Sequence, residues 1–320
     1  MAYDVAALGE LLIDFTQNGK SEQGNPIFEA NPGGAPANVL AMLRKVDRKC
    51  AFLGKVGADA FGDQLENTLK EVGVDTRALR RDREIHTTLA VVTTFENGDR
   101  DFSFYRKPGA DINLSADELD EEILRSCRIF HFGSLSLTDE PCRTATQRAV
   151  AIAREAGAVI SFDPNLRPPL WPNDEAAKEQ IRWGLGQCDV LKIADNEIEF
   201  MTGETDFDKG AAILQKRYPN IRLLNVTAGA EGSRSYYGAS KVFVPGCTLG
   251  GVIETTGAGD TFCASVLNFV LDNGLDNLSE AQLREMLRFA NAAAYLVTTR
   301  RGAIRSMPER ADVEAVLAKM

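Results

Sequence analysis

The chain has 320 residues with 36 Lys and Arg and 46 Asp and Glu, so its formal net charge is −10. This acidic balance argues against a nucleic-acid duplex as a partner, because a duplex binder needs a basic surface to displace counterions. Hydrophobic residues make up 44% of the chain, and we expect no membrane span because no apolar stretch is long enough. The start carries no signal-peptide pattern and the six cysteines never form C-x-x-C, so we expect a cytoplasmic protein with reduced thiols.

The first 75 residues alternate between strand and helix patterns. Apolar runs predict buried strands at 5–9 and 50–57. Pro36 is placed to open a helix that reaches residue 44. Apolar residues at helical spacing predict a second helix over 61–72, which Gly73 can close.

The next segment departs from this alternation. Residues 87–95 are rich in β-branched side chains, residues 101–106 alternate, and Glu96-Asn97-Gly98-Asp99 lies between them. Asn-Gly between two strand-like runs is a strong hairpin signal. Together with the turn-rich residues that follow the first strand, this hairpin predicts a small inserted β-sheet, a lid formed by approximately 11–32 and 86–107.

The second half of the chain returns to regular alternation. Strand-like runs lie at 129–133, 158–163, 190–193 and 221–226, with helical patterns at 139–156, 174–187, 206–217, 260–273 and 279–298. This pattern indicates a mainly parallel sheet covered by helices on both faces. We therefore predict one three-layer α/β/α domain over residues 1–320 with a β lid, and ligands at the carboxyl ends of its strands.

The segment with most chemical information is Glu254-Thr255-Thr256-Gly257-Ala258-Gly259-Asp260-Thr261-Phe262, which joins an extended stretch to a helix. The small residues Gly257, Ala258 and Gly259 let the amides of a helix N-terminus approach an anion. Asp260 in the same turn can take the proton of an attacking hydroxyl, and phosphoryl transfer needs both functions. A plain glycine turn beside a helix-favouring aspartate is the structural alternative.

This segment resembles the C-terminal signature of the ribokinase-like carbohydrate kinases, also called the phosphofructokinase-B type. Gly33-Gly34-Ala35-Pro36-Ala37-Asn38 and Gly54-Lys55-Val56-Gly57-Ala58-Asp59-Ala60-Phe61-Gly62 resemble the N-terminal signature. The resemblance covers the chain from Gly9 to Pro308. It implies a ribokinase-like fold, ATP and Mg²⁺ as cofactors, and transfer of phosphate to a sugar with Asp260 as catalytic base.

The resemblance also implies a set of sugar-binding residues. The family's aspartate after the first strand corresponds to Asp14, while Gly33 and Gly34 would let the backbone pass close to the sugar and Asn38 would bind its hydroxyls. Strand parity places Phe104 and Arg106 on one face, so both are expected to reach the substrate. Alternatively, Phe104 packs in the core of the lid and Arg106 is a surface charge.

A further segment bears on the identity of the substrate. Asp163-Pro164-Asn165-Leu166-Arg167 resembles the Asp-x-Asn-x-Arg segment of fructokinases and 2-keto-3-deoxygluconate kinases, which implies substrate-binding roles for Asp163 and Arg167. Residues 102–111 are most similar to bacterial fructokinases, so the expected reaction phosphorylates the 6-hydroxyl of D-fructose. Arg106 and Arg167 can also clamp a sugar acid, so 2-keto-3-deoxygluconate stays open, as do ribose, a nucleoside and a non-catalytic sugar sensor.

The nucleotide side follows from the same resemblance. Residues 226–233 resemble the family's nucleotide loop, and residues 192–203 its N-x-x-E segment, with Ala194 in the asparagine position. Glu254 stands where many relatives have aspartate near a monovalent-cation site, which leaves K⁺ activation open. The exposed lid edges predict a homodimer through the lid. The implied cofactor-binding residues are Lys192, Thr227, Gly229, Gly232, Asn291 and Gly302, and the implied metal residue is Glu197.

Overall fold

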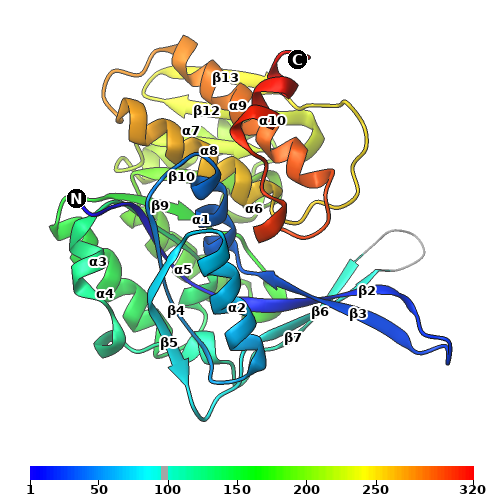
Figure 1. Ribbon diagram of the computed structural model, residues 1–320. Coiled ribbons are helices and arrows are strands. Elements are labelled where there is room, and N and C mark those ends of the chain that lie inside the picture. The colour runs from blue at the N-terminus through cyan, green and yellow to red at the C-terminus, as the bar shows by residue number, and fades with distance from the viewer. Residues whose placement is uncertain (95–99) are drawn as a thin grey trace.

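A nine-stranded sheet forms the centre of the computed structural model, which describes residues 1–94 and 100–320 (Figure 1). Its strands are β1 (Tyr3–Leu8), β4 (Cys50–Gly57), β5 (Asp75–Asp82), β8 (Cys127–Gly133), β9 (Val159–Asp163), β10 (Val190–Ala194), β11 (Leu223–Thr227), β12 (Gly232–Tyr237) and β13 (Ser240–Pro245). They lie in the order β13-β12-β11-β10-β9-β8-β1-β4-β5. The pairs from β5 to β11 are parallel, and the pairs that β12 makes with β11 and β13 are antiparallel.

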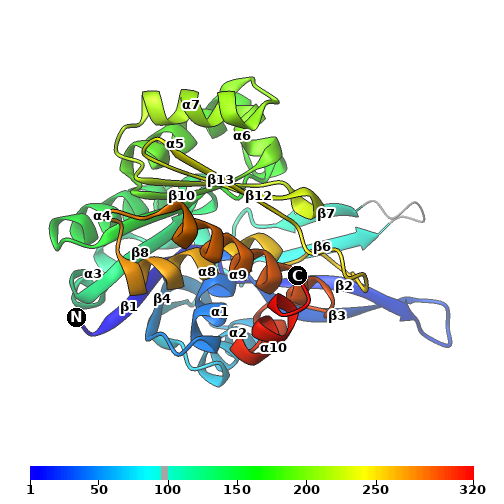
Figure 2. The same cartoon turned by 90° about the horizontal axis from the view of Figure 1, so that it is seen from above.

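Helices cover both faces of this sheet (Figure 2). One face carries α1 (Ala35–Lys45), α2 (Ala60–Glu71), α8 (Ala258–Asn273), α9 (Glu280–Thr298) and α10 (Arg310–Leu317). The other carries α3 (Glu121–Ser126), α4 (Cys142–Glu155), α5 (Asp174–Gln187), α6 (Asp195–Thr202) and α7 (Phe207–Arg217). Side chains alternate across a strand, so Val5 and Ala7 of β1 belong to one hydrophobic core and Ala6 and Leu8 to the other. The predicted three-layer α/β/α class is confirmed.

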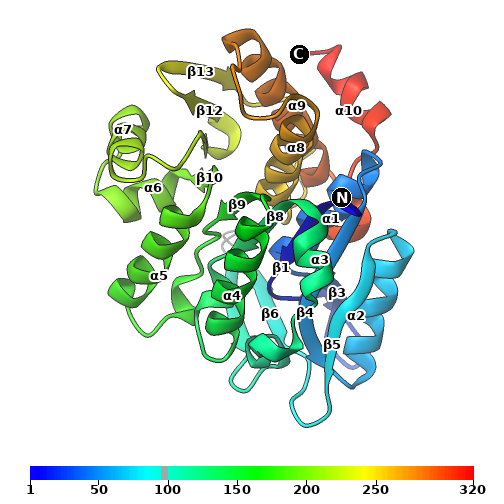
Figure 3. The same cartoon turned by 90° about the vertical axis from the view of Figure 1, so that its left-hand side faces the viewer.

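A second, four-stranded sheet extends away from the main body (Figures 1 and 2) and lies behind it in Figure 3. Its order is β3 (Pro26–Gly33), β2 (Leu12–Lys20), β6 (Leu89–Thr94) and β7 (Arg100–Tyr105). The rings of Phe15 in β2 and Phe61 in α2 meet edge to face at 5.5 Å and join this sheet to the body. The predicted turn Glu96-Asn97-Gly98-Asp99 lies outside the described residues.

The strand order determines where a ligand can bind. The chain passes from β1 to β4 and β5 on one side, and later places β8 to β11 on the other. Ligands of open α/β sheets bind outside the carboxyl ends of strands near such a change of direction. Within residues 1–94 and 100–320, none of the helices combines the length and apolar character that crossing a bilayer requires.

Candidate active site

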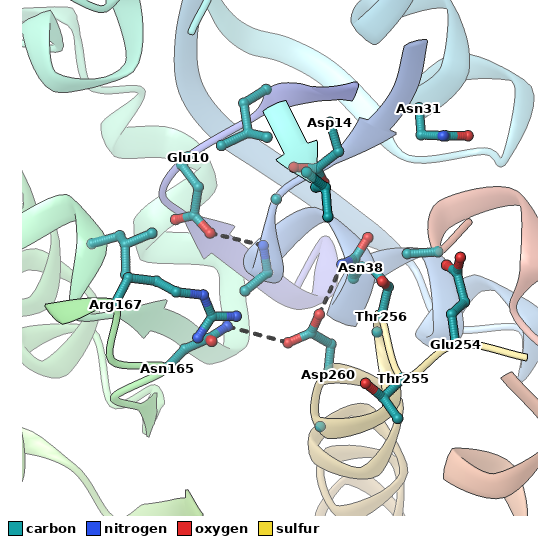
Figure 4. Close-up of a pocket in the computed structure, with 18 of the residues that line it drawn as sticks. Glu10, Asp14, Asn31, Asn38, Asn165, Arg167, Glu254, Thr255, Thr256 and Asp260 are labelled. Atoms are coloured by element: carbon teal, nitrogen blue, oxygen red, sulfur yellow. Dashed lines mark hydrogen bonds between the residues drawn. The ribbon is translucent and has the colours of Figure 1, made fainter. Parts of the chain in front are cut away.

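A cavity of about 400 Å³ lies at the carboxyl ends of β1 and β10 and extends to the second sheet (Figure 4). We call it the acceptor cavity. The sequence-predicted residues that line it are Asp14, Gly34, Asn38, Phe104, Arg167, Lys192, Glu197, Gly257, Gly259, Asp260 and Gly302. Residues from both ends of the chain therefore meet at the place that the sheet topology favours.

Asp260 lies in the first turn of α8 and is 7% exposed. Its Oδ2 accepts a hydrogen bond of 2.7 Å from Asn38 Nδ2, and its Oδ1 accepts one of 3.5 Å from Asn165 Nδ2 (Figure 4). Burial raises the pKa of Asp260 to about 6, although the bond from Asn38 lowers it. A carboxylate with such a pKa is suited to general-base chemistry near neutral pH.

The turn before Asp260 has little room for side chains. Gly257 adopts a φ of 79°, a left-handed conformation that favours glycine, and a Cβ there would lie 3.1 Å from the Cβ of Ala303. A Cβ on Gly259 would lie 3.0 Å from Lys192 Nζ. The first amides of a helix have no acceptor within the helix, so this turn can present N–H groups to an anion.

Lys192 in β10 supplies a buried cation beside that turn. Its Nζ lies 3.2 Å from Oδ1 and 3.1 Å from Oδ2 of Asp163. Burial acts to lower the pKa of Lys192, but Asp163, Glu197 and Asp260 raise it above its usual value. Asp163, expected to contact substrate, is instead absent from the cavity lining and is 2% exposed, because its carboxylate turns toward Lys192.

The opposite wall of the acceptor cavity comes from β2 and the start of α1. Asp14 faces the cavity, and burial raises its pKa to about 7, although Arg167 lowers it. Gly34 lines the cavity, but Gly33 does not. A Cβ on Gly33 would lie 2.3 Å from Asp14 Oδ2, so this glycine makes room for the carboxylate rather than for a ligand.

Phe104 and Arg106 do not line one cavity together, although strand parity placed them on one face. Phe104 in β7 lines the acceptor cavity, whereas Arg106 follows the end of β7 and does not. The Arg106 guanidinium donates to Asp111 Oδ2 at 2.8 Å, Thr138 Oγ1 at 3.0 Å and the Leu135 carbonyl at 2.8 Å. Arg106 is therefore neither a surface charge nor a free substrate ligand.

A second cavity of about 280 Å³ lies on the other side of the first turn of α8. Thr227, Gly229, Gly232, Ala258 and Asn291 line it, and Thr255 and Gly259 line both cavities. Gly302 was expected to line this second cavity, but it lines the acceptor cavity instead. Its N–H donates a hydrogen bond of 3.0 Å to Glu254 Oε1, which holds it on that side. We call this second space the nucleotide cavity.

Glu197 is the residue that the sequence assigns to the metal. Its two carboxylate oxygens accept hydrogen bonds from the amides of Leu166 at 2.7 Å and Ala194 at 2.8 Å. Burial raises the pKa of Glu197, although Lys192 lowers it. The described residues contain no cluster of three His, Cys, Asp or Glu side chains that could hold a metal ion.

Comparison with known proteins places the chain in a family. The model of the pfkB family carbohydrate kinases matches residues 2–310. The chain belongs to the pfkB family of carbohydrate kinases. It is 42% identical to fructokinase-2 of Solanum lycopersicum, over 98% of this chain and 95% of that relative.

Solved structures of this family are similar over the whole chain. A fructokinase of Xylella fastidiosa with bound ATP has a TM-score of 0.90 and 30% identity, covering 99% of both chains. A fructokinase of Vibrio cholerae O395, in a fructose-, ADP- and calcium-bound form, has a TM-score of 0.87 and 31% identity, covering 99% of this chain and 100% of that one. The ribokinase-like fold expected for this kinase is confirmed.

Sequence reasoning missed several polar residues of the kinase's acceptor cavity. Asn165 has a φ of 44°, which turns the chain after β9 so that its amide faces Asp260. Glu10 follows β1 by two residues, and Asn31 lies in β3 across from Asp14. The signal for Glu10 was its place in the Gly9-Glu10 segment, and that for Asn165 was its place in the Asp163–Arg167 segment, whereas Asn31 lies in neither. Glu10 and Asn165 were passed over because their neighbours match the family motifs better.

Proposed function

We propose that this carbohydrate kinase transfers the γ-phosphoryl group of ATP to the 6-hydroxyl of D-fructose. The observation that carries the proposal is the position of the first turn of α8 between two cavities. Thr255 and Gly259 line both cavities, and the buried carboxylate of Asp260 faces the acceptor cavity. A phosphoryl group can therefore pass from one cavity to the other along this turn. The names of similar proteins favour fructose as the acceptor.

The residues of the acceptor cavity divide the work of orientation and proton transfer. Asp14 accepts hydrogen bonds from sugar hydroxyls, while the Gly34 backbone and Asn38 limit where the ring can lie. Asp260 accepts the proton of the 6-hydroxyl as that oxygen attacks phosphorus. The bond from Asn38 holds the carboxylate toward the cavity. The second sheet acts as a lid that excludes water, a competing acceptor.

Charge on the moving phosphoryl group is balanced by this chain's donors. The amides of the first turn of α8 face it, and Lys192 and Arg167 supply positive charge from the cavity wall. Thr227, Gly229 and Gly232 hold the nucleotide in the second cavity. Mg²⁺ would supply further charge neutralisation when bound, and Glu197 would hold its water shell.

The position of Arg106 bears on the alternative acceptor. A clamp on the carboxylate of 2-keto-3-deoxygluconate would need Arg106 beside Arg167, but Arg106 is bonded to Asp111. This observation favours an uncharged sugar.

An ADP-release assay on a panel of D-fructose, ribose, nucleosides and 2-keto-3-deoxygluconate tests the assignment. Turnover of the keto acid with inert fructose would overturn it, and sugar binding with no ATP consumption would indicate a sensor.

The variant Asp260→Ala tests the role of the base. We expect kcat to fall by about 10²–10⁴, the usual contribution of a general base, with the affinity for fructose within a few-fold of wild type. Rapid-quench kinetics and calorimetric sugar binding measure the two quantities. Near-normal turnover in this variant would remove Asp260 from its assigned role.

Two further features extend the proposal. The outer strand β3 of the second sheet exposes Ile27 and Phe28, so we infer a homodimer in which two copies pair through this sheet. All six cysteines are unpaired thiols, which supports a reducing compartment such as the cytoplasm.

A further inference from the structure

One carboxylate bonds to the base of both β6 and β7, the antiparallel strand pair of the second sheet that we call the lid ribbon. Thr88 immediately precedes β6, and Arg106 immediately follows β7. The Thr88 hydroxyl donates to Asp111 Oδ1 at 2.5 Å, and Arg106 Nε donates to Asp111 Oδ2 at 2.8 Å. Asp111 therefore joins the two strands at the point where they leave the body of the molecule.

The contacts at the base of the ribbon are buried, so they are costly to break. Thr88, Arg106 and Asp111 are 1%, 3% and 3% exposed. Arg106 also donates from Nη2 to the Leu135 carbonyl at 2.8 Å and from Nη1 to Thr138 Oγ1 at 3.0 Å. Loss of one partner of a buried ion pair leaves the other charge unpaired, which costs far more than the loss of a surface pair. The base of the ribbon is therefore held in one position.

The 3₁₀ turn that carries Asp111 is itself bonded to the large sheet. Asn113 Nδ2 in this turn donates to Asp82 Oδ2 of β5 at 2.6 Å. The Asn113 carbonyl accepts a hydrogen bond of 3.1 Å from Lys55 Nζ of β4. Lys55 Nζ also lies 3.4 Å from Asp82 Oδ2. A continuous set of bonds thus runs from the large sheet through this turn to the lid ribbon.

Both strands of the ribbon contribute side chains to the acceptor cavity. Val92 of β6 and Phe104 of β7 line it. Val92 lies four residues beyond Thr88, a span of about 13 Å in an extended strand, and Phe104 lies two residues before Arg106. A rotation of the ribbon about its base would displace both side chains relative to the other walls. The shape of the cavity on this side therefore depends on the bonds at the base.

We propose that Asp111 is a positioning residue that holds the lid ribbon over the acceptor cavity and thereby keeps water away from the phosphoryl group. The inference rests on the proposed function, because it needs a phosphoryl transfer that the lid protects. Asp111 lies outside the cavity lining and acts through Val92 and Phe104. When its bonds to Thr88 and Arg106 are weakened, water competes more often with the sugar hydroxyl as acceptor.

The variants Thr88→Val and Asp111→Asn test this role. Thr88→Val keeps the shape of the side chain and the ion pair, and Asp111→Asn removes the charge that pairs with Arg106. In both, we expect the amides of residues 89–92 to exchange in heavy water at least about fivefold faster than in the wild type, because one lost hydrogen bond favours local opening. With ATP and D-fructose, the ADP released in excess of sugar phosphate should also rise about fivefold.

The matched control is Thr68→Val, which removes a hydroxyl that is 0% exposed and donates within α2, to the Gln64 carbonyl at 2.8 Å. It should leave both readings unchanged. If it raises both as much as Thr88→Val does, the effect is a general loss of stability and the inference fails. Unchanged exchange or unchanged excess ADP in folded Thr88→Val would also overturn it, whether or not Asp111→Asn folds. Failure of the wild type to phosphorylate D-fructose would instead count against the proposed function, since amide exchange does not depend on turnover.

Discussion

Two opposing effects on the pKa of Asp260 define its chemistry at the residue scale. Burial raises this pKa to about 6, and the hydrogen bond from Asn38 Nδ2 lowers it. A carboxylate accepts a proton only when it is ionised. We therefore expect kcat/KM for the sugar to rise with pH between about 6 and about 7, as Asp260 and Asp14 ionise, and to level off above this range.

Replacing Asn38 by leucine should shift the pH range in which kcat/KM rises, which is the acid limb of the pH profile. Asn38→Leu removes a donor to the ionised form, so the protonated form of Asp260 gains stability and its pKa rises further. The acid limb of kcat/KM is then expected at higher pH than in the wild type. A pH profile from 5 to 9 in buffers of constant ionic strength measures the shift.

Asn31→Leu provides a matched control for this profile. Asn31 lines the same cavity, but its Nδ2 donates to Thr16 Oγ1 at 2.5 Å rather than to Asp260. The acid limb of the kcat/KM profile of Asn31→Leu should stay at the wild-type pH even if KM changes. If both variants shift equally, or if neither does, Asn38 does not act through the carboxylate of Asp260.

Single residues also show where reading from sequence reaches its limit. Asp260 and Gly257 could be placed at the start of a helix because the glycine turn and the helix that follows it are local in sequence. Arg106 could not, because its environment depends on Asp111 and Thr138, which reach it only after the chain has folded. Gly302 likewise meets Glu254 across 48 residues, and no pattern near residue 302 indicates that contact.

At the scale of elements, the first turn of α8 belongs to both cavities. Gly259→Ala would place a Cβ 3.0 Å from Lys192 Nζ, so the cation must shift within the site. We expect kcat/KM for ATP to fall about tenfold, equivalent to about 1.4 kcal/mol of transition-state stabilisation. The free energy of unfolding should change by less than about 1 kcal/mol, because alanine is a better helix former than glycine.

Gly186→Ala in α5 is the comparison for that variant. A Cβ on Gly186 meets nothing within 4 Å, and its φ is not left-handed. It should stabilise the protein by about 0.5–1 kcal/mol and leave kcat/KM for ATP unchanged. Equal kinetic losses in both variants would mean that the site does not depend on the space at Gly259. Chemical denaturation and steady-state kinetics provide the two readings.

The edge strand β3 leads to a prediction about assembly. Ile27 and Phe28 are 45% and 39% exposed on β3, an arrangement that favours pairing with another chain. Phe28→Lys is expected to shift the protein from dimer toward monomer in sedimentation equilibrium at micromolar concentration. Phe243→Lys makes the same change on β13, at an edge of the large sheet, and should stay dimeric. A wild-type monomer would contradict the proposed dimer.

Most elements could be predicted because their patterns are local. The helix predicted over 174–187 matches α5, and the strand predicted over 50–57 matches β4. The prediction ended the chain with two helices, but α10 follows them, and its eight residues show too few helical repeats to be recognised. Strands β12 and β13 were also missed, although Val242 and Val244 are buried at alternate positions, a pattern that was available.

At the scale of the whole molecule, sugar binding should couple to the stability of the fold. Residues of the central sheet, the second sheet and α8 line the acceptor cavity, so a sugar that fills it would contact all three. D-fructose at 100 times its Kd is expected to raise the free energy of unfolding by about 2.7 kcal/mol. We expect Asp14→Asn to weaken sugar binding and therefore to lose most of this gain at the same concentration. Equal stabilisation of both proteins in thermal unfolding would contradict the role of Asp14.

The bond between Asn38 and Asp260 joins residues 222 positions apart. At a synthesis rate of 5–20 residues per second, a ribosome needs on the order of 10 to 45 s between adding one residue and adding the other. A nascent chain therefore carries Asp14 and α1 long before it carries the carboxylate that we propose as the base. Chemistry cannot begin until translation is nearly finished, so a prematurely terminated product would bind sugar poorly and consume no ATP.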